Sequence, residues 1–209
     1  MSPRLDLPIA TLAWLFGFAW VGWAGSWIPL ATLSVLAAAR LLVVDVNTRE
    51  LLKPRPGSWL LGAAGGAAMV ALTYALYGPL AAVFPRLPAA TRQLYEVLRA
   101  LGYRPLALGG LVLVVSACEE VVWRGRPLAA AAAAAGSRRL TWPAVARVAG
   151  LAALYGSAHL TSGSLLLAAL GAGCGFAWGL LRVGGRSLWP AIVTHAAWDL
   201  AVLVAWPLT

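Results

Sequence analysis

Residues 106–135 have the sequence LALGGLVLVVSACEEVVWRGRPLAAAAAAA, and this stretch decides the fold class of the chain. As one helix, its 30 residues would be about 45 Å long at 1.5 Å per residue. The hydrocarbon core of a bilayer is about 30 Å thick, so such a helix would tilt or protrude. Glu119 and Glu120 stand near its middle, and Pro127 is placed to kink it just beyond them. We therefore expect a membrane helix that carries two carboxylates at bilayer depth.

The remainder of the chain has the composition of a polytopic membrane protein. Of the 209 residues, 61% are hydrophobic and 11% are charged, and the mean hydropathy is +0.81, well outside the range of soluble domains. Residues 7–39 contain no charged residue, are too long for one span, and carry a hairpin signal at Gly25-Ser26 and Pro29. The other apolar segments are residues 58–84, 106–135, 148–159, 164–181 and 188–208. We expect an all-α transmembrane bundle of about seven spans that encloses a polar cavity.

The charge pattern indicates a membrane surface as the partner and gives no support for nucleic acid. The formal net charge is +9, but the basic residues cluster between the apolar segments, as in loops that meet anionic headgroups. Residues 86–104 have the spacing of an amphipathic interfacial helix. We expect one integral-membrane domain in two parts, with scaffold helices and this interfacial segment in residues 1–105 and a catalytic core in residues 106–209.

The first of three polar motifs lies in residues 119–124, EEVVWR. Glu120 and Arg124 are four residues apart on a helix and can form an ion pair. Glu119 lies about 100° around the helix from Glu120, away from that partner, which leaves it available as a general acid or base. Taken alone, the motif fits a structural ion pair at a helix end equally well.

The other two motifs each contain a histidine. Tyr155 and His159 are four residues apart on one helix face, and so are His195 and Asp199. A single buried histidine is often a packing residue bonded to a backbone carbonyl, and an Asp–His pair can close the end of a bundle. Burying both members of such a pair for structure alone gains little over apolar residues, however. We expect Asp199 to accept from His195 or to share a target with it.

The three motifs together are more specific than any one of them. They lie on separate predicted helices and contain both histidines and three of the seven acidic residues. An ionisable group at bilayer depth is costly, so it usually faces the bundle interior and has a function. A glutamate, two histidines and an aspartate in one cavity can position a water, deprotonate it and stabilise an oxyanion. This is the chemistry of carbonyl hydrolysis, and of peptide bonds above all.

In this order, EExxxR, aromatic-xxx-His and His-xxx-Asn/Asp resemble the motifs of the CPBP family (CAAX protease and bacteriocin-processing, also called Abi) of intramembrane endopeptidases. The flanking residues agree as well, at Arg124-Gly125, at Ala158-His159-Leu160 and in residues 185–192, GRSLWPAI. The resemblance covers about residues 111–202. It implies that Glu119 is the base that activates water.

The same resemblance implies supporting roles for the other residues. His159 and His195 would be partners of the base in the cavity, and Glu120 and Arg124 would have an orienting role. Asp199 would position the water or stabilise the oxyanion.

Two positions depart from the family pattern. Tyr155 stands where Phe is usual, and Asp199 stands where Asn is common. An ionised Asp199 cannot donate to an oxyanion. Either it is protonated in its apolar site, or it orients His195.

Metal dependence has two interpretations. Glu119, His159 and His195 could ligate Zn²⁺ together with a water, which is the usual composition of a catalytic zinc site. No HExxH sequence is present, and the resembled family is also described as glutamic-type. We favour a mechanism without a cofactor.

Two other functions remain open at this point. The buried acids and histidines could form the relay of a proton-coupled transporter or channel, or the chain could be a non-catalytic immunity or scaffold protein of the membrane. We favour a protease that cleaves near the C-terminal tail or anchor of a membrane-associated protein. Residue usage rich in Ala, Gly and Arg, with Lys53 as the single lysine, is typical of a GC-rich bacterium, so we expect the bacterial cytoplasmic membrane and a protein-sorting signal as substrate.

Overall fold

The computed structural model describes residues 6–99, 102–129 and 140–208, and every regular element within these ranges is helical. The elements are α1 (Asp6–Ala24), α2 (Ile28–Val44), α3 (Val46–Leu51), α4 (Ser58–Val83), α5 (Leu87–Arg99), α6 (Pro105–Glu120), η2 (Val121–Gly125), α8 (Trp142–His159), η3 (Leu160–Ser162), α9 (Leu165–Gly185), α10 (Trp189–Asp199) and η4 (Leu200–Ala205). The predicted all-α class is confirmed.

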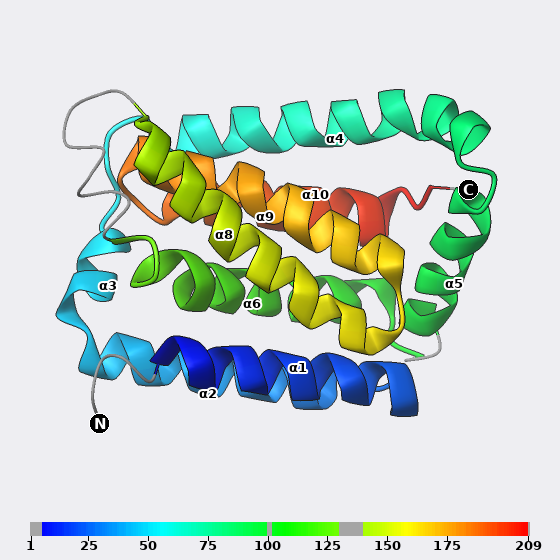
Figure 1. The fold of residues 1–209 in the computed structure, drawn as a ribbon, viewed down its shortest axis with the longest axis horizontal. Helices are drawn as coiled ribbons and strands as arrows, with labels where there is room; N and C mark the ends of the chain where they lie inside the picture. The colour runs from blue at the N-terminus through cyan, green and yellow to red at the C-terminus, as the bar shows by residue number, and fades with distance from the viewer. Residues whose placement is uncertain (1–5, 100–101, 130–139, 209) are drawn as a thin grey trace.

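The long helices run side by side as a bundle (Figure 1). In the described part of the chain, four of them are long and apolar enough to cross a membrane: α1 from Leu7, α4, α6 together with η2, and α9. The apolar helix α2 and the continuous segment formed by α10 and η4 are shorter. Within the described residues, each apolar segment expected to span the membrane contains a helix, and the chain is an integral, multi-pass membrane protein.

Residues 106–135 do not form the single helix that the sequence suggested. The α-helix ends at Glu120, continues as a π-helical turn over η2, and gives way to a bend and turn at residues 126–128. Pro127 lies in that turn, outside the helix, where the N–H that proline lacks is not needed for a helical hydrogen bond. The alanines of residues 130–135 lie outside the described residues.

Helix α5 lies across one end of the bundle instead of along it (Figure 1). Its Tyr95 is buried, whereas Arg92 and Glu96 are exposed, so the helix is amphipathic. The Tyr95 hydroxyl donates to the Val202 carbonyl at 2.8 Å and accepts from the Leu208 N–H at 3.0 Å. These bonds attach α5 to the C-terminal segment.

Helices α8 and α9 approach each other closely at glycines. A Cβ at Gly156 would lie 2.8 Å from the Ala168 carbonyl oxygen, and a Cβ at Gly171 would lie 3.0 Å from Nδ1 of His159. Such contacts are too short for a β-carbon, so the absence of a side chain sets the distance between the two helices. The position of His159 depends on this packing.

We predict that Gly156→Ala destabilises the protein by about 1–3 kcal/mol, because the added methyl group would push α8 away from α9. Gly150→Ala is the matched control, because Gly150 lies on the same helix and its Cβ would meet nothing within 4 Å. Thermal unfolding in detergent compares the two variants. Equal midpoints would show that the close approach does not limit stability.

Candidate active site

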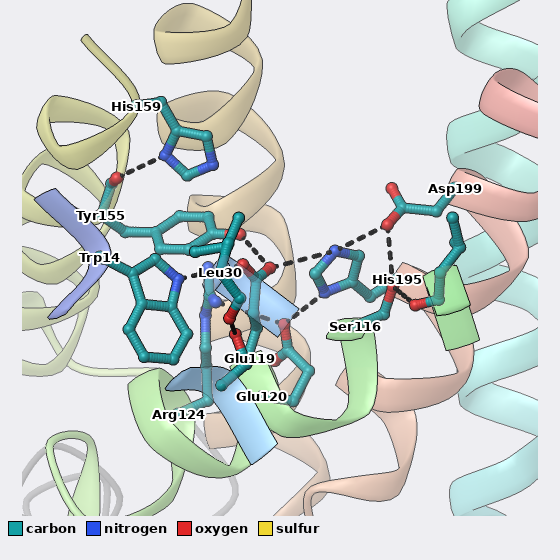
Figure 2. A network of polar contacts seen from close by, with 12 residues as sticks. Trp14, Leu30, Ser116, Glu119, Glu120, Arg124, Tyr155, His159, His195 and Asp199 are labelled. Atoms are coloured by element: carbon teal, nitrogen blue, oxygen red, sulfur yellow. Dashed lines mark hydrogen bonds and ion pairs between the residues drawn. The ribbon is translucent and has the colours of Figure 1, made fainter. Parts of the chain in front are cut away.

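The three polar motifs meet inside the bundle, on α6 with η2, on α8, and on α10 (Figure 2). Five of their side chains are almost completely excluded from the surface: Glu119, Glu120, Arg124, His159 and His195. Asp199 is 15% exposed at its side chain. The structure therefore brings the predicted site residues into one region.

Glu120 is the link between two of the motifs. Its Oε1 lies 3.3 Å from Nη1 of Arg124, which is the predicted ion pair within one helix, and 2.8 Å from Nδ1 of His195 on α10. The second contact joins two helices and was not evident from the sequence. The same oxygen atom of Glu120 thus forms an ion pair with Arg124 and accepts a hydrogen bond from the His195 imidazole.

Aromatic rings enclose the Arg124 guanidinium. It lies 4.4 Å from the ring centroid of Tyr155 and 5.4 Å from that of Trp178, distances at which a ring face attracts a cation. A Cβ at Gly175 would lie 2.6 Å from Nη2 of Arg124, so α9 leaves space for the guanidinium by having no side chain there.

His195 is held from three sides. Its ring is stacked on Trp178, with centroids 3.5 Å apart and an interplanar angle of 16°. With Nδ1 bonded to Glu120, its Nε2 faces two further carboxylates, 3.2 Å from Oδ2 of Asp199 and 3.8 Å from Oε2 of Glu119. The expected contact between His195 and Asp199 is present. The bond of Nδ1 to a carboxylate fixes the orientation of the ring, so Nε2 is the nitrogen available for chemistry.

Ser116 is a site residue that the sequence reasoning missed. Its Oγ lies 2.8 Å from Oδ2 of Asp199 and also 2.8 Å from the Val112 carbonyl oxygen. Ser116 is completely buried and precedes Glu119 by one helical turn. A polar residue at that spacing, in an otherwise apolar stretch, is the signal that could have identified it.

His159 is positioned by its own helix and by α1. Its Nδ1 lies 2.7 Å from the backbone carbonyl oxygen of Tyr155, and its ring packs on Phe18 at 4.0 Å between centroids. A carbonyl can only accept, so Nδ1 carries the proton and Nε2 is an acceptor. Figure 2 shows the ring on the far side of Tyr155 from Glu120.

Glu119 accepts two hydrogen bonds that the sequence did not indicate. The indole Nε1–H of Trp14 donates to Oε1 at 3.0 Å, and the hydroxyl of Tyr155 donates to Oε2 at 2.5 Å (Figure 2). Both donors are neutral. The expectation that Glu119 has no ion-pair partner on its own helix agrees with this geometry, but the carboxylate is not free.

A cavity of about 110 Å³ adjoins these groups and is lined by Glu119, Tyr155, His159, His195 and Asp199. Its other walls are apolar, with leucines from α2, α5, α6 and η4, among them Leu30, Leu98, Leu111 and Leu203. The volume is sufficient for water together with a small group of a substrate. The polar residues thus occupy one wall of a cavity that otherwise suits apolar side chains.

The metal alternative finds no preformed site in the described residues. No group of three or more His, Cys, Asp or Glu side chains there is arranged to hold a metal ion. Cys118 and Cys174 are free thiols.

Residues 102–201 match the family model described as type II CAAX prenyl endopeptidase Rce1-like. Comparisons with curated proteins and with solved structures find no match. The matched range contains all three motifs and spans just under half of the chain, so the resemblance to the CPBP family is confirmed over residues 102–201. Together with the apolar helical bundle, this match supports an intramembrane protease. Trp14 lies outside the matched range.

We predict that Glu120→Gln and Arg124→Ala each destabilise the protein by about 3–5 kcal/mol, because each leaves a buried partner uncompensated. The double variant should lose less than the sum of the single losses. The exposed pair of Glu50 and Lys53, 2.8 Å apart, is the control, and Glu50→Gln should cost at most about 1 kcal/mol.

Chemical denaturation of all the variants measures these losses. A double variant that loses the full sum would show that Glu120 and Arg124 are not directly coupled.

Proposed function

We propose that this protein is an endopeptidase of the bacterial cytoplasmic membrane, and that it hydrolyses a peptide bond near the C-terminal tail or membrane anchor of another membrane-associated protein. The observation that carries the proposal is the position of Glu119. This carboxylate lies within a helical bundle, beside a cavity with room for water, and 3.8 Å from the Nε2 of a fixed histidine.

The proposed reaction uses Glu119 as general base. A water in the cavity transfers a proton to Glu119 while its oxygen attacks the substrate carbonyl carbon, which gives a tetrahedral oxyanion. His195, protonated on both nitrogens, directs Nδ1–H to Glu120 and donates its Nε2–H to that oxyanion. Glu119 then returns the proton to the departing amide nitrogen, the carbon–nitrogen bond breaks, and the carboxylate is restored.

Asp199 and Ser116 support the Nε2 side of His195. Asp199 lies between the imidazole and the Ser116 hydroxyl, so the three groups form a connected polar chain at the Nε2 side of the ring. His159 lines the same cavity and presents Nε2 as an acceptor, which suits it to orient the water.

The cavity supports an apolar substrate segment. Most of its lining consists of aliphatic and aromatic side chains, and these bind an extended apolar segment better than a charged one. The family description refers to a CAAX endopeptidase, which acts near a C terminus. For a chain with bacterial residue usage, C-terminal sorting tails of surface proteins meet both conditions.

We predict that Glu119→Gln abolishes cleavage, because the amide cannot accept the proton from water, while the protein remains folded in the membrane. The control is Glu96→Gln on α5, because Glu96 is exposed and distant in sequence from the motifs. Both variants are co-expressed with candidate proteins that carry C-terminal hydrophobic tails, and processing is followed by a change in mass. Substantial cleavage by Glu119→Gln would remove Glu119 as the base.

We also expect proteolysis to be independent of metal ions. The described residues hold no group of three His, Cys, Asp or Glu side chains arranged for a metal ion, so the donor set of the site does not fit one. Purified enzyme in detergent should cleave equally well before and after treatment with a zinc chelator. Loss of activity on chelation, with recovery on adding Zn²⁺, would establish the metalloprotease alternative.

A further inference from the structure

We propose that Trp14 and Tyr155 are positioning residues for Glu119, and that α1 is therefore part of the catalytic unit. Their N–H and O–H groups hold the carboxylate in the orientation from which it reaches a water in the cavity. The inference rests on the proposed role of Glu119 as base, and it adds a residue from outside the range that matches the family model.

The geometry of the carboxylate is the first argument. Trp14 donates to Oε1 at 3.0 Å and Tyr155 donates to Oε2 at 2.5 Å. One donor on each oxygen fixes the rotation of the carboxylate plane as well as its position. An ionised carboxylate offers about four acceptor positions, so two remain for water. Both donors are uncharged and leave the basic function of Glu119 in place.

The direction of the Trp14 indole is the second argument. Three other indoles in the described residues, those of Trp27, Trp123 and Trp178, have a buried Nε1 without a hydrogen-bond partner. This bundle therefore tolerates buried indoles whose N–H group makes no hydrogen bond. Trp14 is completely buried like Trp123, but its N–H is directed at a carboxylate that is 105 positions away in the sequence.

One face of α1 supports two of the predicted catalytic groups, Glu119 and His159. Phe18, one turn beyond Trp14, packs on the His159 ring at 4.0 Å between centroids. Trp14 itself is fixed by an edge-to-face contact with Trp123, with centroids 5.7 Å apart. The Thr161 hydroxyl donates to the Leu15 carbonyl at 2.9 Å, which attaches α1 to the segment after α8. The helix is thus held in register against the site.

Tyr155 also connects Glu119 to the remainder of the site. Its hydroxyl contacts Glu119, its ring lies against the Arg124 guanidinium, and its backbone carbonyl accepts from His159. Removal of the hydroxyl alone, in Tyr155→Phe, leaves the ring and the backbone contacts in place. The two phenylalanine variants, Trp14→Phe and Tyr155→Phe, therefore each remove one donor to Glu119.

The test uses the full-length protein in proteoliposomes, with Trp14→Phe, Tyr155→Phe and their combination. Trp20→Phe is the matched control, because it makes the same change on the same helix, at an indole whose ring packs on Phe16 and Trp23. Incorporation of β-(3-benzothienyl)alanine at position 14 replaces N–H by sulfur in a ring of nearly the same shape. It provides a second variant if Trp14→Phe does not fold.

The first measurement is infrared difference spectroscopy of the Glu119 carboxyl bands, which are assigned by their loss in Glu119→Gln. We expect these bands to shift in Trp14→Phe, in the benzothienyl variant and in Tyr155→Phe, and to stay in place in Trp20→Phe. If Trp14 served only to fill space, without a hydrogen bond to Glu119, its substitution would not shift the Glu119 carboxyl bands. This measurement needs no substrate.

The second measurement is cleavage of a quenched-fluorescence peptide with an apolar segment, chosen from a library by wild-type activity. We expect kcat to fall roughly 10- to 100-fold in each single variant, the range that a misplaced catalytic group produces, with KM unchanged within about twofold. The double variant should lose less than the product of the single losses, because both residues act through Glu119.

The outcomes separate the two proposals. Unshifted bands in Trp14→Phe and in the benzothienyl variant would overturn the positioning role, whatever the activity. Shifted bands with unchanged kcat would overturn it as well, because the contact would then have no effect on the chemistry. If the bands shift in the variants as expected but the wild-type protein cleaves no peptide and no candidate protein, the proposed hydrolysis is refuted and only the donor contacts remain.

Discussion

The buried carboxylate of Glu120 is the interaction on which the site depends. It is completely excluded from the surface and is shared between Arg124 on η2 and His195 on α10. A carboxylate at this depth is stable only when its partners are within contact distance. The attraction works in both directions, because Arg124 and His195 are themselves buried and need the same carboxylate. The pairing therefore fixes how α6 and α10 meet, and with it the direction of His195 Nε2.

Aromatic faces take the place of water around these charges. Trp178 is stacked on His195 and lies beside Arg124, and the Tyr155 ring also lies against the guanidinium. Such faces attract cations without adding a second set of ionised groups. They also exclude solvent, which strengthens each polar contact inside the site. The charged groups are thus kept close together, and the adjacent cavity remains apolar on its other walls.

Contacts within one helix were predictable from the sequence, and contacts between helices were not. The spacing of four residues correctly placed Arg124 beside Glu120 and Asp199 beside His195, because helical periodicity fixes which side chains are neighbours. The contacts of Trp14 with Glu119, Ser116 with Asp199, and Glu120 with His195 span 105, 83 and 75 positions. They depend on how helices pack, and no local pattern in the sequence encodes that.

The other differences have local causes. Residues 106–135 were expected as one helix because their composition favours helix throughout, but a turn follows Gly125 and contains Pro127. Residues 1–105 were expected to serve as scaffold because no polar motif is visible in them. Trp14 carries one N–H among apolar neighbours, and eleven tryptophans in the chain give no sequence reason to select it.

The two π-helical turns have a consequence for how this protein tolerates changes in length. One begins directly after Glu120 and the other directly after Asp199, and π-turns of this kind recur at functional sites. Each residue of an α-helix advances the chain by about 100°. Deletion of a single residue between Glu120 and Arg124 would therefore rotate the arginine by about 100° around the helix, away from its place against the Tyr155 ring, even if every remaining side chain were kept. Homologues should accept substitutions at Val121 or Val122 far more readily than an insertion or a deletion there.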